Sequence, residues 1–176
     1  LIVRSASDVN VDVLSKARKL RVIGRAGIGV DNIDIESATA RGIVVMNTPF
    51  GNSITTAEHT ISLMLSIARQ IPEANNSTHA GKWEKSRFIG VELMGKTLGI
   101  VGCGNIGALV ADRAQGLKLK VIAYDPYLSS ERAKQLGVEK VELNELLKRS
   151  DFISLHTPLT EATRDMINVN SISEMK

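Results

Sequence analysis

The chain has 176 residues, enough for one large domain or two small ones, and its 43% hydrophobic and 23% charged residues are ordinary for a globular protein. Its net charge of +3 is spread without a basic run, so we expect no nucleic-acid partner. A single cysteine forms no intramolecular disulfide and no apolar run approaches the roughly 20 residues of a membrane span, so we expect a cytoplasmic protein without a membrane partner.

The two ends of the chain look like interior segments. It begins with Leu-Ile-Val-Arg, which is typical of a buried strand, and ends with Ser-Ile-Ser-Glu-Met-Lys, which is typical of a helix. We therefore expect an internal fragment of a longer protein that is inactive on its own.

Up to Thr48, short β-branched runs alternate with helical patterns. Strands are expected at 1–3, 21–23 and 43–46, each an apolar run typical of a sheet covered on both faces. Helices are expected at 11–20, after an N-cap at Asn10, and at 34–41, ended by Gly42. This βαβαβ order predicts a parallel sheet.

The turn cluster at 49–52 is the expected boundary between domains 1–49 and 50–176. Ser53 is expected to cap a long helix that reaches about Gln70. Apolar residues lie nearly all round this helix, which predicts burial on more than one side, either at a subunit interface or between two domains of one chain. Residues 71–95 show no clear period and are expected to be irregular, with Trp83 as a packing residue.

The α/β order then restarts. Strands are expected at 97–101 and 120–124, near Val141, and at 152–156, and helices at 106–117, 130–136, 143–148 and from about Ser171. The chain is therefore predicted to be α/β, with two parallel-sheet units joined by a helix.

A dinucleotide fingerprint opens the second unit, with the sequence Gly102-Cys103-Gly104-Asn105-Ile106-Gly107. It follows one predicted strand and precedes a helix. Asp125 ends the next strand 18 residues after Gly107, close to the spacing that this fold requires. The alternative is a glycine turn in an unrelated α/β domain.

Each residue of the fingerprint has a physical task. Gly102 allows the tight turn, Gly104 lets the backbone approach a pyrophosphate, and Gly107 lets helix and strand pack together. The backbone amides of Asn105 and Ile106 would face the phosphates at the helix N-terminus. Asp125 would accept hydrogen bonds from the ribose hydroxyls and repel a 2′-phosphate, which predicts NAD rather than NADP as the cofactor. Cys103 is expected to serve packing rather than redox chemistry.

Two arginines, Arg4 and Arg25, each follow a predicted strand of the first unit. If these strands are adjacent and parallel, both arginines lie at the carboxyl edge, where open α/β sheets bind ligands. Two guanidinium groups suit a substrate with more than one anionic group. The alternative is a pair of solvated arginines that pair with Asp31.

A glycine loop follows Arg25. Gly27 and Gly29 either let the backbone approach a ligand closely or form a simple turn. Asp31 and Asn32 then lead into the next helix, and helix capping explains them.

Segments along the whole chain resemble the D-isomer-specific 2-hydroxyacid dehydrogenases, in order: 1–5, 24–32, 47–53, 57–60, 81–83, 95–107 and 156–159. The resemblance implies a flavodoxin-like substrate-binding domain and a Rossmann NAD-binding domain, both incomplete. Arg4, Ser5 and Arg25 look most like the branch of the family that oxidises 3-phosphoglycerate in serine biosynthesis, where the matching arginines hold the anionic groups of the substrate.

The resemblance implies further contacts. Ile28 would lie near the nicotinamide, Gly51 and Asn52 would border the substrate, and Thr157 and Pro158 would line the cofactor edge. The glycines Gly27 and Gly29 would lie beside the substrate. A homodimer through the NAD-binding domain, or a tetramer built from it, is implied as well.

The family removes the hydroxyl proton with a histidine oriented by a glutamate, while an arginine holds the carboxylate. The resemblance places these three residues after Lys176, so we assign no catalytic residue within the chain and predict no metal site. His59 in the apolar helix, His79 in the irregular stretch and His156 beside the cofactor threonine are expected to be structural.

Two other functions remain open. One is the same chemistry on another small 2-hydroxy acid, such as glycerate, lactate or formate. The other is an NAD-sensing module similar to the dehydrogenase-related transcriptional corepressors.

Overall fold

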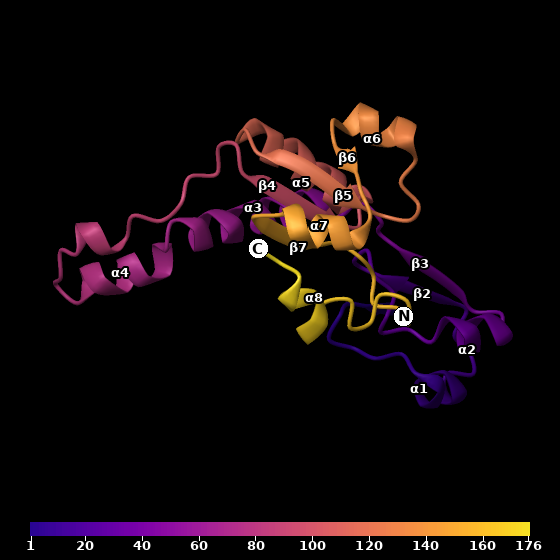
Figure 1. The fold of residues 1–176 in the computed structure, drawn as a ribbon. Coiled ribbons are helices and arrows are strands. Elements are labelled where there is room, and N and C mark those ends of the chain that lie inside the picture. The colour runs from indigo at the N-terminus through magenta and orange to yellow at the C-terminus, as the bar shows by residue number, and fades with distance from the viewer. The chain divides into compact units, whose positions relative to one another are not determined.

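The computed structural model describes all residues from Leu1 to Lys176. The chain divides into two compact units, Leu1–Ser53 and Ile54–Lys176 (Figure 1). The turn cluster at 49–52 lies directly before this division.

The first unit is a parallel sheet with two helices. Its elements are β1 (Ile2–Val3), α1 (Val11–Lys16), β2 (Val22–Arg25), α2 (Ile35–Ala40) and β3 (Val44–Asn47). The strands lie in the order β1-β2-β3, and both pairs are parallel. The βαβαβ order expected from the sequence is therefore present.

Side-chain caps start both helices of the first unit. The side chain of Asn10 accepts a hydrogen bond from the Val13 N–H at 3.1 Å, and Asp34 accepts one from the Ser37 N–H at 2.9 Å. Asp34 is thus the N-cap of α2 and not its first residue. α1 ends at Lys16, earlier than predicted, because Ala17 leaves helical geometry and its N–H closes a turn onto the Leu14 carbonyl.

One face of the first sheet carries the core of this unit. Ile23 of β2, Leu14 of α1 and Ala38 of α2 belong to one buried cluster, so both helices cover the same face. The alternate strand residues on the other face are exposed: Ile2, Val22, Val44 and Met46. The prediction of a sheet covered on both faces is therefore wrong for this unit, because both crossover helices pack on one side.

The second unit begins with helices and continues as an α/β sheet. α3 (Ser53–Ala68) and α4 (Ile71–His79) precede a single 3-10 turn at Lys85–Arg87. The sheet elements follow: β4 (Thr97–Val101), α5 (Asn105–Gly116), β5 (Lys120–Tyr124), α6 (Ser130–Leu136), β6 (Glu139–Lys140), α7 (Leu143–Arg149), β7 (Phe152–Leu155) and α8 (Val169–Ser173). The strand order is β6-β5-β4-β7, and every pair is parallel.

Both faces of the second sheet are covered, as the apolar runs predict. Ile100 of β4 packs in a cluster with Val110 of α5, and Val101, its neighbour on the opposite face, packs in another with Leu146 of α7. A Cβ at Gly99 would lie 2.6 Å from the Leu146 Cδ2 atom, so glycine at this position lets α7 approach β4 closely.

α3 differs in detail from its prediction. Ser53 is the first helical residue and its buried hydroxyl makes no hydrogen bond, so it does not act as the expected cap. Ala57, Met64 and Ala68 are buried, whereas Ile54, Leu63 and Ile67 are exposed. His59 is exposed as well, contrary to its expected burial.

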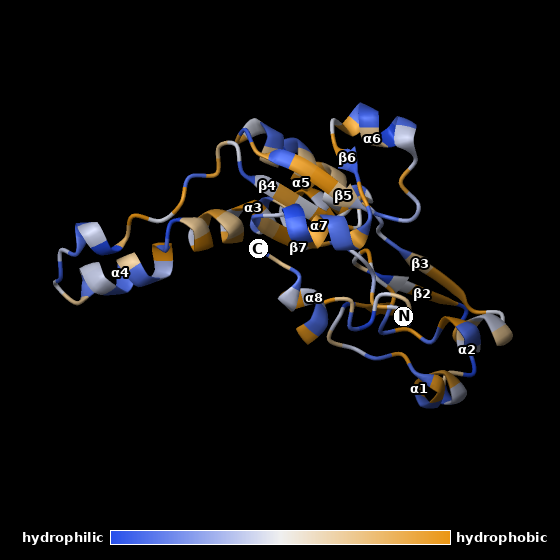
Figure 2. Cartoon of the chain, in the orientation of Figure 1, coloured by the Kyte–Doolittle hydropathy of each residue, from blue (hydrophilic) through white to orange (hydrophobic).

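The stretch expected to be irregular contains the helix α4. None of its residues is buried, so it carries no apolar period that a sequence reading could detect (Figure 2). Pro72 lies in its first turn, where a missing N–H costs nothing, and His79 is its last residue. Trp83, expected to pack, is 85% exposed. No helix in the chain combines the length and apolarity of a membrane-spanning segment.

Candidate functional site: a nucleotide cleft and an arginine edge

The fingerprint forms the turn between β4 and α5. Gly102 has a φ of +90°, a conformation that side-chain-bearing residues rarely adopt, so glycine is required at this position. A Cβ on Gly107 would overlap the Gly102 carbonyl oxygen, so this glycine allows α5 to pack onto the turn. A Cβ on Gly104 would meet nothing within 4 Å, so the space in front of it is open.

α5 begins with free backbone donors. Gly104 is its N-cap and makes no side-chain capping bond, and no acidic residue lies in the first turn. The first N–H groups, which include those of Asn105 and Ile106, therefore stand at the positive end of the helix dipole without a side-chain acceptor. An oxyanion such as a pyrophosphate is the ligand that such a helix end favours.

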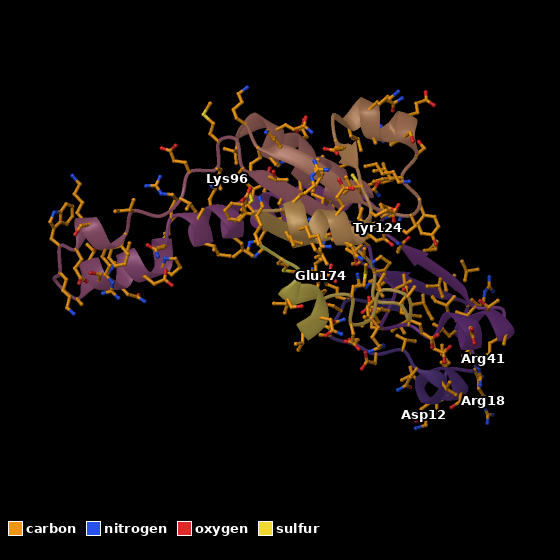
Figure 3. The ribbon with its side chains drawn as sticks, viewed as in Figure 1. Asp12, Arg18, Arg41, Lys96, Tyr124 and Glu174 are labelled. Atoms are coloured by element: carbon orange, nitrogen blue, oxygen red, sulfur yellow. The ribbon has the colours of Figure 1, made fainter.

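Asp125 is fixed beside the fingerprint by two backbone hydrogen bonds. Its Oδ2 atom accepts the Cys103 N–H at 2.8 Å, and its Oδ1 atom accepts the Tyr127 N–H at 2.8 Å. The residue follows β5, whose last residue Tyr124 is labelled in Figure 3 and accepts the Gly102 N–H at 2.8 Å. A carboxylate offers about four acceptor sites, so further sites remain for ribose hydroxyls.

A cleft of about 340 Å³ lies at this edge of the sheet. Gly102, Gly104 and Asp125 line it together with Thr157 and Pro158, which follow β7. The structure thus brings five of the predicted cofactor residues to one cavity, and Asn105, Ile106 and Gly107 lie in the first turn of the adjoining helix. The remaining predicted cofactor contact, Ile28, belongs to the first unit.

The end of β7 packs directly on the fingerprint. The His156 N–H donates to the Val101 carbonyl at 2.8 Å. A Cβ on Gly102 would lie 2.8 Å from both the His156 carbonyl oxygen and the Thr157 Cγ2 atom. Gly102 is therefore needed for the contact between two strand ends as well as for the turn.

The carboxyl edge of the first sheet carries the predicted substrate residues. Arg4 follows β1 directly and Arg25 is the last residue of β2, and these strands pair in parallel with Val3 opposite Arg25. Neither arginine forms an ion pair, so the alternative of pairing with Asp31 is not observed. Ser5 follows Arg4, and Gly51 and Asn52 lie beyond β3, so all three loops leave the same edge of the sheet.

The loop after β2 shapes this edge. A Cβ on Gly27 would overlap the Nη1 atom of Arg25 and lie 3.1 Å from its Cζ atom, so glycine leaves room for the guanidinium. A Cβ on Gly29 would lie 2.7 Å from the Oδ1 atom of Asp31. The Asn47 side chain and the Thr48 N–H hold the loop through the carbonyls of Ile28 and Gly27, at 2.8 and 3.1 Å.

The sequence profile of the family "D-isomer specific 2-hydroxyacid dehydrogenase, NAD binding domain" matches residues 61–176. The chain belongs to this family. Proteins called D-3-phosphoglycerate dehydrogenase from Archaeoglobus fulgidus, Methanocaldococcus jannaschii and Homo sapiens are 51%, 53% and 51% identical to it and match the whole chain. The chain covers 33%, 34% and 33% of these relatives, about a third of their length.

Solved structures of similar proteins agree with the fold. The TT0316 protein from Thermus thermophilus matches with a TM-score of 0.92 and 35% sequence identity. The match covers 100% of this chain and 56% of the Thermus thermophilus chain. A D-lactate dehydrogenase from Aquifex aeolicus, complexed with NAD and lactic acid, matches with a TM-score of 0.91 and 33% sequence identity. This match covers 99% of this chain and 53% of the Aquifex aeolicus chain.

The residues of the cleft fit the NAD that this family binds. An open glycine, uncapped helix donors and a fixed carboxylate together suit a pyrophosphate and a ribose. NAD is therefore the cofactor of this 2-hydroxyacid dehydrogenase unit.

The cleft has further lining residues that the sequence does not predict. Tyr127, which is 96% exposed, lines the cleft, and so does a turn after Pro158 that contributes Thr160, Thr163 and Met166. The Thr163 hydroxyl donates to the Pro158 carbonyl and accepts the Thr160 N–H at 2.8 Å. The Thr-x-x-Thr spacing is a local signal for such a turn, but its position at the cleft depends on the tertiary fold.

Burial shifts the pKa values of two side chains near the cleft in the direction that favours their neutral forms. Burial, reinforced by the negative charge of Asp125, raises the pKa of the Cys103 thiol, which is 7% exposed and part of the core. Cys103 therefore packs as expected and carries no thiolate near neutral pH. Burial lowers the pKa of the His156 imidazole, whose Nε2 atom lies 2.9 Å from the Ser154 hydroxyl.

Proposed function

We propose that the complete protein oxidises D-3-phosphoglycerate to 3-phosphohydroxypyruvate with NAD, the first step of phosphorylated serine biosynthesis. The observation that carries this proposal is the pair of arginines, Arg4 and Arg25, without carboxylate partners at the carboxyl edge of the first sheet. The names of relatives about half identical to the chain support the same substrate.

The first unit would bind the substrate. Arg4 and Arg25 would hold its carboxylate and phosphate, since guanidinium groups bind such oxyanions with two parallel hydrogen bonds. Ser5 would add a hydroxyl donor. Gly27, Gly29, Gly51 and Asn52 would form the surrounding backbone, and Ile28 would contact the nicotinamide end of the cofactor.

The second unit would bind the cofactor. NAD, when bound, accepts the hydride from the carbon that carries the substrate hydroxyl. The helix donors of Asn105 and Ile106 would hold the pyrophosphate, Asp125 would hold the adenosine ribose, and Thr157 and Pro158 would fix the adjoining wall.

The proton acceptor is proposed to lie outside this chain. His59 and His79 are exposed on α3 and α4, and His156 is occupied by its contact with Ser154. We propose that the arginine, glutamate and histidine of the reaction follow Lys176 in the complete protein. The chain alone would then bind NAD without turnover.

We further propose a cytoplasmic homodimer through the NAD-binding unit, with a tetramer as an assembly of two dimers. The exposed large apolar side chains of α3 and the following segment support the dimer, because a subunit interface would remove them from water. They are Ile54, Leu63, Ile67, Ile71, Trp83, Ile89 and Met94.

The substrate is tested by steady-state kinetics of the complete protein with NAD and D-3-phosphoglycerate, D-glycerate or D-lactate. We expect efficient oxidation of the phosphorylated acid, and an increase in its KM of roughly 10- to 100-fold on Arg4→Ala or Arg25→Ala, as loss of charged hydrogen bonds implies. The control is Arg41→Ala. Arg41, labelled in Figure 3, follows the carboxyl end of α2 and so lies at the opposite edge of the sheet.

Two outcomes would overturn the proposal. Oxidation of D-lactate without oxidation of D-3-phosphoglycerate would favour a dehydrogenase of another 2-hydroxy acid, as in the similar structure from Aquifex aeolicus. Tight NAD binding without oxidation of any of these acids would favour an NAD-sensing module.

A further inference from the structure

Asn32 makes three side-chain hydrogen bonds that join two loops of the first unit. Its Nδ2 group donates to the Arg4 carbonyl at 2.9 Å and to the Ser7 carbonyl at 2.6 Å. Its Oδ1 atom accepts from the Nε of Arg25 at 3.3 Å. The two carbonyls accept and the guanidinium donates, so the partners fix the orientation of the amide.

The contact extends to the backbone of the same two loops. The Asn32 carbonyl accepts the Val9 N–H at 2.8 Å. Asn32 is therefore bound at several points to the segment between β1 and α1, which contains Arg4 and Ser5. The expected role of Asn32 was helix capping, but the N-cap of α2 is Asp34, two residues further along the chain.

Asn32 also determines which part of the Arg25 guanidinium is free. The Nε–H is used by Asn32, and the group lies over Gly27, where a Cβ would overlap it. Arg25 forms no ion pair, and its Nη1 and Nη2 groups make no hydrogen bond within the chain. The edge that remains carries two parallel N–H donors, which match the two oxygens of a carboxylate or phosphate.

We propose that Asn32 is a positioning residue of the substrate site: its carboxamide ties the Arg4–Ser7 loop to Arg25 and presents the Nη edge of that guanidinium to an oxyanion of the substrate. The inference rests on the proposed function, because it requires Arg25 to bind substrate. Pre-organisation of this kind lowers the entropic cost of fixing a flexible arginine at the moment of binding.

A double-mutant cycle in the complete protein tests the inference. The variants are Asn32→Ala, Arg25→Ala and the double substitution, and the readouts are the KM for D-3-phosphoglycerate, the KM for NAD and kcat. Asn32→Ala should raise the substrate KM roughly 5- to 30-fold and leave the KM for NAD unchanged. In the Arg25→Ala background the same substitution should raise the substrate KM by a smaller factor, because only its contacts with the Arg4 and Ser7 carbonyls then remain to be lost and residues that act through one another are not additive.

Two further variants separate positioning from general destabilisation. Asn32→Asp keeps the size and the acceptor facing Arg25, but it cannot donate to the Arg4 and Ser7 carbonyls, so the substrate KM should rise as in Asn32→Ala. Asn10→Ala removes an asparagine hydrogen bond from the same unit, the cap of α1 at Val13. This control should lower the unfolding temperature without raising the substrate KM.

The outcomes distinguish the two proposals. If Arg25→Ala leaves the substrate KM unchanged, the proposed anion site is wrong, and the role of Asn32 is wrong with it. If Arg25→Ala raises the KM but Asn32→Asp does not, or if the effects of Asn32→Ala and Arg25→Ala are fully additive, the positioning role alone is overturned.

Discussion

At the level of single residues, Asp125 both holds the fingerprint turn through backbone hydrogen bonds and lines the cleft, so one substitution affects both roles. Its oxygens hold the N–H groups of Cys103 and Tyr127, and the same carboxylate faces the cleft. Asp125→Ala should weaken NAD binding roughly 10- to 100-fold, as the loss of a charged hydrogen bond implies. It should also reduce the preference for NAD over NADP, because the charge that repels a 2′-phosphate is removed.

Isothermal titration of the complete protein with both nucleotides measures this effect. Asp112→Ala is a matched control, since Asp112 is an exposed carboxylate on the neighbouring helix α5 and does not line the cleft. Unchanged NAD affinity in Asp125→Ala would remove the residue from the binding site.

His156 should make stability depend on pH. Burial lowers the pKa of its imidazole, so below its ordinary pKa of about 6.5 the unfolded chain binds a proton that the native chain does not. Stability should therefore fall as pH falls from about 7.5 to 5.5. Thermal unfolding should show a smaller fall in Tm over this range for His156→Gln than for the unchanged protein.

The pH range is chosen to isolate the histidine. The carboxyl groups whose pKa values are lowered by hydrogen bonds, such as Asp34 and Asp151, titrate at more acidic pH. An equal loss of Tm in the variant would show that burial of His156 does not contribute. His79→Gln is the control, because His79 is exposed at the end of α4.

The sequence predicts the glycines of the fingerprint but not the roles of Asn32 and Tyr127. Gly102 and Gly107 are predicted because the conformation and close contacts of the turn select glycine locally, and Gly104 because a pyrophosphate would need the open space in front of it. Asn32 was assigned to capping because its main partners lie 25 and 28 residues earlier in the chain, and no local pattern reports such contacts. Tyr127 was missed as part of the cleft for a similar reason, since its exposure to the cavity depends on the end of β7.

At the scale of elements, helix α5 offers two glycines with opposite expected behaviour. A Cβ on Gly107 would overlap the Gly102 carbonyl and lie 3.2 Å from the Ile100 Cγ2 atom, whereas one on Gly116 would meet nothing within 4 Å. Gly107→Ala should destabilise the protein by about 1–3 kcal/mol through overpacking. Gly116→Ala should be neutral or stabilise it by up to about 1 kcal/mol.

Urea unfolding followed by circular dichroism measures both changes. NAD titration adds a second readout: Gly107→Ala should weaken binding by displacing the fingerprint turn, while Gly116→Ala should leave it unchanged. Equal stability of the two variants would contradict the packing role of Gly107.

Helices and strands are predicted well where burial leaves an apolar pattern in the sequence. β4, β5 and α6 have the bounds expected from the sequence, because their apolar residues face the core and Ser129 and Gly137 mark the ends of α6. α4 has no buried residue, so its sequence lacks the apolar stripe by which a helix is recognised. The faces of the first sheet were also beyond prediction, since an apolar strand run does not say on which side both helices will pack.

At the scale of the whole molecule, the two units divide the proposed reaction between them. The first offers two arginines without carboxylate partners, and the second offers helix donors and a fixed carboxylate. His59 and His79 are exposed on α3 and α4, His156 contacts Ser154, and the chain covers about a third of the length of its relatives. The family could be predicted from the sequence, because its motifs extend along the whole chain.

The proposed dimer would bury exposed apolar side chains of α3. Ile67 on α3 is 73% exposed, and a subunit interface over this helix would bury it. Ile67→Asp should raise the dissociation constant of the dimer roughly 100-fold or more, because the interface would lose a buried apolar side chain and gain an unpaired charge. Sedimentation equilibrium of the complete protein measures this. Ile172→Asp, at an exposed position on α8, should leave the dimer intact, and NAD affinity should be unchanged in both variants. A dimer of unchanged strength in Ile67→Asp would place the subunit interface elsewhere on the molecule.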